Sequence, residues 1–245
     1  MEISARTSSQ VFTLRTEKMT RIHILSLPWI ASLVTLMANV PPIPANAQSC
    51  GGKIIHQGKA YATVQVGNQC WLAENLQATA DAEGAPIPRL VAPEAWSEQL
   101  LSPAHCQIEV PGHSKPVILY NRWAAAKACP QGWHLPTLEE WDALAAHLGG
   151  WQVAGYSMKS RTGWPSINDR TNRSRFNAKP HGLRDMEGEF NFQGEGAYWW
   201  TDSDNDLLVD CAFVWIEDDT MDLYRHSFFN TMGFSVRCVQ NEREQ

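Results

Sequence analysis

The sequence predicts an α+β domain with antiparallel sheets, two flanking helices and long loops, cross-linked by disulfides. Three observations support this class. A strongly capped helical pattern occupies residues 137–148, strand-like segments crowd the C-terminal part of the chain, and six cysteines are spread between residues 50 and 238. Helices that precede a run of antiparallel strands are typical of α+β domains, and 245 residues suffice for one such domain.

The first 47 residues have the features of a signal peptide. Basic residues up to Arg21 precede an apolar run from Ile24 to Val40, and Ala45-Asn46-Ala47 supplies small residues at a cleavage site. A membrane-spanning helix is disfavoured because Pro28 interrupts the run and prolines follow it. We therefore expect a mature domain over 48–245 that is exported to the periplasm, cell surface or medium. Residues 1–18 would be an overhang if translation starts at Met19.

The charge and aromatic content of the chain indicate which classes of binding partner to expect. The chain carries 20 basic and 26 acidic residues, and because the first 47 residues hold four basic against two acidic ones, the mature part carries −8. This charge disfavours nucleic acid and anionic lipid, so we expect no nucleic-acid partner and no membrane insertion after cleavage. Eleven tryptophans indicate either an aromatic core or an aromatic surface for a ligand.

All six cysteines lie in the exported part, which predicts three disulfides with fifteen possible pairings. The alternative is a zinc site. It is disfavoured because no C-x-x-C spacing occurs in the chain.

The local elements can be assigned in chain order. Alternation over 60–66, a Gly67-Asn68 turn and the return at 69–72 predict a β-hairpin. Six prolines between residues 86 and 116 predict a loop-rich insertion at about 89–118, held by Cys106. The alanine-rich stretch 121–128 predicts a short helix that ends at Pro130.

The helix after His134 is the best-specified element. Thr137 and Glu140 have the spacing of a capping box, and Trp141, Leu144, Ala145 and Leu148 would form one apolar stripe. Beyond Gly149-Gly150 we expect long loops, followed by strands at 197–201, 211–216, 221–226 and 233–239.

Six ordered segments resemble a known family. They are Gly67-Asn-Gln-Cys-Trp-Leu-Ala-Glu-Asn-Leu76, Tyr120-Asn-Arg-Trp-Ala-Ala-Ala126, Cys129-Pro-Gln-Gly-Trp-His-Leu-Pro-Thr137 with Glu140-Trp141, Phe176-Asn-Ala178, Tyr198-Trp-Trp200 and Gly233-Phe-Ser-Val-Arg-Cys238. Together they resemble the Fibrobacter succinogenes major paralogous domain, over about Gly58 to Gln240. The resemblance implies a C-type-lectin-like fold whose first and last strands pair, with one helix on each side of the sheet. It also implies a disulfide between Cys129 and Cys238.

No common catalytic signature occurs in the chain. The phrase Leu-Pro-Thr-x-x-Glu-Trp and the segment Gly182–Gly188 also resemble the formylglycine-generating branch, which would imply an oxidase with a reactive cysteine pair. The pairing implied for Cys238 disfavours that activity. His134 is expected to be structural.

Candidate ligand residues lie near the paired tryptophans. Asp202, Asp204 and Asp206 alternate as calcium ligands do, but Leu207 replaces the required glycine, so no cofactor is expected, with calcium as the alternative. Adjacent strand residues point to opposite faces, so one of Trp199 and Trp200 can be exposed, where Trp164 could join it; the alternative is that all of these rings are core.

We therefore expect an exported, non-catalytic recognition module that binds a glycan or a surface partner. The alternatives are a structural envelope protein without a ligand, and the oxidase.

Overall fold

The computed structural model of the chain describes residues 50–99, 101–166, 170–202, 211–228 and 231–242. These residues belong to one compact unit, Asn46–Gln245. The predicted signal peptide, Asp204 and Asp206 lie outside the described residues. Within the part of the chain that is described, no helix has the length and apolar character needed to cross a bilayer. The fold is a mixture of helices and mostly antiparallel sheets, as the sequence predicts.

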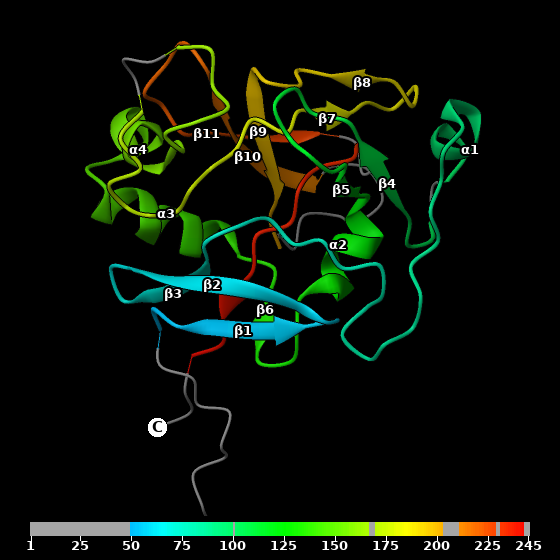
Figure 1. The fold of residues 1–245 in the computed structure, drawn as a ribbon, viewed down its shortest axis with the longest axis horizontal. Helices are drawn as coiled ribbons and strands as arrows, with labels where there is room; N and C mark the ends of the chain where they lie inside the picture. The colour runs from blue at the N-terminus through cyan, green and yellow to red at the C-terminus, as the bar shows by residue number, and fades with distance from the viewer. Residues whose placement is uncertain (1–49, 100, 167–169, 203–210, 229–230, 243–245) are drawn as a thin grey trace, which may run out of the picture. The chain divides into compact units, whose positions relative to one another are not determined.

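The largest sheet joins the two ends of the domain. Its strand order is β1-β2-β3-β12-β6, with β1 Lys53–His56, β2 Lys59–Val66, β3 Gln69–Leu72, β12 Val239–Gln240 and β6 Trp133–His134. The predicted hairpin is confirmed as β2 and β3, which pair antiparallel. Figure 1 shows the blue and cyan N-terminal strands beside the red C-terminal segment, and Val239 pairs with Trp71 there.

A second sheet of three strands has the order β11-β10-β9, with β9 Gly196–Trp200, β10 Cys211–Glu217 and β11 Tyr224–Phe228. All three lie close to their predicted positions. The strand predicted at 233–239 is shorter than expected, because only Val239 and Gln240 belong to β12. Upstream, Phe234 pairs with Tyr120 and Ser235 pairs with Trp199. That segment therefore links different elements instead of extending one sheet.

The two predicted helices are confirmed. Helix α2, Arg122–Ala128, starts at Asn121, whose side chain accepts a hydrogen bond from the Ala124 amide. Helix α3, Leu138–His147, starts with the predicted capping box: the Thr137 hydroxyl accepts from the Glu140 amide at 3.2 Å, and the Glu140 carboxylate accepts from the Thr137 amide at 2.9 Å. On the predicted stripe, Trp141, Leu144 and Ala145 are buried.

A further helix, α4 at Trp151–Met158, occupies a region where loops were expected. Gly149-Gly150 separates it from α3, and Gly155 lies in its middle, so the sequence signal for a helix is weak there. The structure explains the glycine. A Cβ atom on Gly155 would lie 2.6 Å from the Asp222 carbonyl oxygen and 2.7 Å from that of Met221, so Gly155 allows α4 to approach the segment before β11.

The insertion at 89–118 contains a short helix, where the sequence allows two helical turns from Glu94 to Leu101, and a pair of strands that was not expected. It includes α1, Pro93–Ser97, and the paired strands β4, His105–Ile108, and β5, Val117–Tyr120. These elements enclose their own apolar cluster around Trp96 and Leu119. Arg184 lies on β7, Leu183–Arg184, which pairs with β8, Phe190–Asn191. The Arg184 guanidinium holds the insertion in place by donating to the carbonyls of Leu90 and Val91, each at 2.9 Å.

Two disulfides are present, Cys50–Cys70 and Cys129–Cys238. The pairing that the resemblance implied is therefore confirmed. The prediction of three disulfides is wrong, because Cys106 is a free, buried thiol within the insertion. Apolar packing takes the place of the disulfide expected to hold this region. The side chain of Cys211 lies outside the described residues.

Two apolar clusters lie on opposite sides of β9, all of whose residues are buried. Tyr198 and Trp200 point into a cluster that includes the alanines of α2. Trp199 points into a cluster that includes Trp141 of α3 and Met158 of α4. One helix thus covers one side of β9, and two helices cover the other.

Candidate functional site

The paired tryptophans are both buried, with 0% of each side chain exposed. The expectation that one of them faces solvent is wrong. Their side chains do alternate, but Ser235 lies alongside β9, where its amide donates to the Tyr198 carbonyl at 3.0 Å. Each indole N–H also has a buried acceptor: Trp199 donates to Asn75 Oδ1 at 2.9 Å and Trp200 to the Tyr120 carbonyl at 2.7 Å. Both rings are therefore core residues.

Trp164 is also a core residue. Its ring is 4% exposed, its N–H donates to the Ala178 carbonyl at 2.9 Å, and the Lys159 ammonium lies 5.1 Å from the ring centroid. The prediction that Trp164 joins an exposed aromatic set is wrong, because the ring packs in the apolar cluster that contains Phe176 and Ala178.

The acidic segment is described only at its start. Asp202 accepts a hydrogen bond from the buried guanidinium of Arg122 at 2.9 Å, which gives it a structural role as a counterion. Asp204 and Asp206 lie outside the described residues. Among the residues that are described, no three His, Cys, Asp or Glu side chains are grouped so as to hold a metal ion. The calcium alternative rests on Asp204 and Asp206 and stays a prediction.

The accessible aromatic surface lies one strand away, on β10 and β11. Phe213 and Trp215 are half-buried neighbours on β10, with ring centroids 5.3 Å apart. Across the strand pair, Trp215 stacks on Tyr224 at 5.0 Å and Phe213 lies 6.3 Å from His226, with interplanar angles of 22° and 27°. We call these four side chains the aromatic face. Neighbouring ring planes in this face are inclined to one another by 22°, 27° and 31°.

Strand alternation produces the aromatic face. In β10, Ala212, Val214 and Ile216 are buried, whereas the residues between them point to the opposite side. The register then places Tyr224 opposite Trp215 and His226 opposite Phe213, so all four rings share one side of the sheet. The β11-β10-β9 sheet is the orange and gold group in Figure 1.

A continuous line of rings connects the aromatic face to the core. Phe234 lies 4.5 Å from the buried ring of Trp200 and 4.8 Å from Phe213. Rigid packing at the inner end holds the outer rings in place. A shallow groove of about 320 Å³ runs along this line, with Phe192, 52% exposed, on its rim.

Two polar side chains, Glu217 and His226, border the groove and are accessible to a ligand. Glu217 is exposed at the end of β10, and its carboxylate accepts from the Trp215 indole at 3.2 Å. His226 is exposed at the other side. The exposed parts of these rings, bordered by a carboxylate and an imidazole, can pack against the C–H groups of a sugar ring while the polar groups bond its hydroxyls.

The aromatic face was not predicted as a site from the sequence, although the residue pattern of β10 indicates it. The 213–217 segment reads Phe-Val-Trp-Ile-Glu, and the charged Glu217 shares its side of the strand with Phe213 and Trp215. A strand face that ends in a charge is the face closer to solvent.

The imidazole of His134 and the thiol of Cys106 are groups that could take part in catalysis, but their contacts fit a structural role. His134 lies between Glu140, 2.9 Å from its Nε2, and Asn241, 2.7 Å from its Nδ1, and the Glu140 hydrogen bond raises the pKa of His134. Burial raises the pKa of the free Cys106 thiol to about 12, which is opposite to the shift of a reactive cysteine.

Comparison with protein families identifies a match that covers most of the chain. The model of the Fibrobacter succinogenes major domain matches residues 64–240, from β2 to the last strand. No curated protein and no solved structure matches the chain. Because the matched region is more than half of the sequence, the chain belongs to the Fibrobacter succinogenes major domain family.

Proposed function

We propose that the protein is an exported, non-catalytic recognition module that binds a glycan on the aromatic face of β10 and β11. The observation that carries this proposal is the set of packed rings around Trp215, half-buried at the surface and braced from the core by Phe234. Rigid, exposed aromatic rings with few polar neighbours are the chemistry that recognises pyranose rings.

Within this proposal the fold is C-type-lectin-like. The antiparallel pairing of β3 with β12 brings the N-terminal hairpin to the last strand, and the disulfide Cys129–Cys238 links the end of α2 to the residue before β12. Fold likeness does not identify a ligand, so the choice of a glycan rests on the aromatic face. Export is supported by the two disulfides, which form in oxidising compartments.

A structural envelope protein is the second candidate. It is favoured by the burial of Trp164, Trp199 and Trp200, because rings in the core stabilise the domain and are not accessible to a ligand. A structural role accounts for those three rings, but it gives no reason for Phe213 and Trp215 to share a partly exposed face.

Glycan-array binding of the purified protein separates the two candidates. The binding proposal predicts retention of a defined glycan class by the wild type and its loss in Trp215→Ala. Trp133→Ala is the matched control, since Trp133 is also half-buried but lies on β6 in the other sheet. Repeating the array with EGTA tests the calcium alternative. Absence of glycan retention by the wild type, or equal loss in both variants, would favour the structural role.

A further inference from the structure

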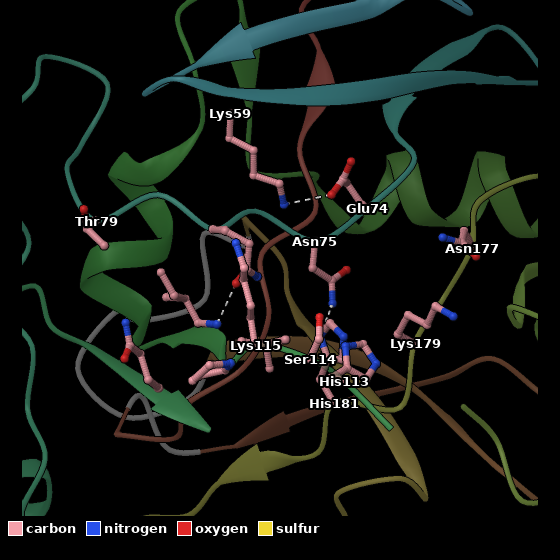
Figure 2. Close-up of a pocket in the computed structure, with 15 residues that line it drawn as sticks. Lys59, Glu74, Asn75, Thr79, His113, Ser114, Lys115, Asn177, Lys179 and His181 are labelled. Carbon is pink, nitrogen blue, oxygen red and sulfur yellow. Dashed lines mark hydrogen bonds and ion pairs between the residues drawn. The ribbon is translucent and has the colours of Figure 1, made fainter. Parts of the chain in front are cut away.

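A second cavity lies away from the aromatic face. Its volume is about 680 Å³, within the range of small-molecule sites. Most of its lining comes from three segments: residues 74–79 after β3, residues 113–118 before and within β5, and residues 177–181. Figure 2 shows Asn75, His113 and His181 close together between these segments.

The cavity lining is rich in cations. Lys59, Lys115 and Lys179 line it, against a single carboxylate, Glu74, which pairs with Lys59 at 2.8 Å. Lys179 donates to Thr162 at 2.7 Å, whereas Lys115 makes no hydrogen bond or ion pair with the described residues. A local excess of positive charge is notable in a chain whose net charge is −6.

A buried arginine lies behind the cavity wall. Arg237 is 0% exposed, and its guanidinium donates only to neutral oxygens: Asn75 Oδ1 at 2.6 Å and the carbonyls of Leu72 and Phe176. Burial lowers the pKa of Arg237 to about 9, and Glu74 opposes this shift. No ion pair among the described residues includes Arg237. The guanidinium therefore adds positive potential behind the cavity wall.

The hydrogen bonds of Asn75 determine the state of His181. Asn75 Oδ1 accepts from Arg237 and from Trp199, which can only donate, so the Asn75 amide nitrogen must donate to His181 Nδ1, 3.0 Å away. A neutral His181 thus carries its proton on Nε2. That atom is buried and has no hydrogen-bond partner among the described residues.

His113 covers His181 on the cavity side. The two rings meet edge to face at 4.9 Å, and burial lowers the pKa of both, that of His181 to about 3. Near neutral pH this wall therefore carries an uncharged imidazole pair, and the positive charge comes from the lysines and Arg237. Any negative charge that enters the cavity meets Lys115 and the field of Arg237, with Glu74 already neutralised by Lys59.

We propose that this cavity is a binding site for a small organic carboxylate, with Lys115 as its main charged contact. The site is independent of the aromatic face. Lys115 is the one lysine of the lining for which the described residues provide no partner, and a carboxylate supplies one. Pro116 and Val117 line the same cavity and would contact the apolar part of the ligand.

Titration with acetate tests the charged contact, with acetamide as the neutral molecule of the same shape. The imidazole NMR signals of His113 and His181 report on the cavity at pH 7. Acetate is expected to shift both signals with a saturable dependence, and acetamide is expected to shift neither. Glucuronate, a carboxylate large enough to fill more of the cavity, is expected to bind more tightly than acetate, whereas methyl glucoside is not expected to bind.

Two lysine variants, one in the cavity and one outside it as the control, test the role of Lys115. Lys115→Gln should weaken acetate binding by about tenfold, the effect of one charge-assisted hydrogen bond. Lys127→Gln removes the same charge from the exposed side of α2 and should leave the binding unchanged. Equal responses to acetate and acetamide, or equal affinities in the two variants, would overturn the proposal. Trp215→Ala should not affect this titration, so its outcome is separate from that of glycan binding.

Discussion

The two sides of strand β10 differ in what covers them. Val214 and Ile216 point into the cluster of Trp141, Trp199 and Met158 and are completely buried. Phe213 and Trp215 point to the other side, where Phe234 packs against Phe213 and both side chains stay half-exposed. Both sides are apolar, so hydrophobicity alone does not distinguish a core face from a surface face. The covering segments, which come from distant parts of the chain, make the difference.

Removing a ring from the covered side should have the largest effect. Trp199→Ala leaves a cavity between α3 and β9 and also removes a hydrogen bond to Asn75, so we expect a loss of about 3–5 kcal/mol in the free energy of unfolding. Urea unfolding, followed by circular dichroism, measures it. A loss below about 1 kcal/mol would mean that the side of β9 facing α3 is not packed as described.

Acid should destabilise the domain through His181, which Asn75 links to Trp199 on the covered side. Burial lowers the folded-state pKa of His181 to about 3, below the ordinary 6.5, so the unfolded chain binds this proton more readily. The stabilising contribution of neutral His181 is present above about pH 6.5 and is lost as the pH falls toward 3, with a slope of up to about 1.4 kcal/mol per pH unit. His181→Gln should flatten the pH dependence of the unfolding free energy in this window. An unchanged slope would contradict the burial of a neutral imidazole.

The cap of α3 provides a smaller, local effect on the covered side. Thr137→Ala removes the acceptor for the Glu140 amide and should cost about 1 kcal/mol, within a range of about 0.5–2. Thr137→Ser keeps the hydroxyl and is the matched control. The same denaturant titration applies, and equal stabilities of the two variants would show that the cap does not stabilise α3.

The smallest change in stability is expected on the open side. Trp215→Ala removes a half-buried ring that has solvent beside it, so we expect a loss of about 1 kcal/mol or less. Compared with Trp199→Ala by the same unfolding measurement, it tests the difference between the two sides directly. Similar losses in the two variants would remove the distinction.

Much of the fold could be predicted because its signals are local. The Gly67-Asn68 turn, the Asn121 side chain and the Thr137–Glu140 box each specify an element within a few residues. Helix α4 could not be predicted, because a glycine within a helix is unfavourable. Gly155 is needed there only because Asp222, which is distant in sequence, lies against it. The free state of Cys106 depends likewise on which residues surround it in three dimensions.

The site was harder to predict than the fold. Alternation correctly assigns Trp199 and Trp200 to opposite sides of a strand, but exposure depends on the Ser235 segment and the helices that cover each side. The aromatic face needs the β10–β11 register to bring Tyr224 beside Trp215. The cavity around Lys115 gathers three segments that are far apart in sequence, and no local pattern marks it.

The affinity of a glycan retained by the wild type, measured by calorimetry for Trp215→Phe and Trp215→Ala, tests the central claim most directly. If the aromatic face binds sugar by stacking, Trp215→Phe should weaken binding in part and Trp215→Ala should abolish it, while both variants stay folded and keep nearly the wild-type free energy of unfolding. Unchanged affinity in Trp215→Ala, with the protein folded, would contradict the claim.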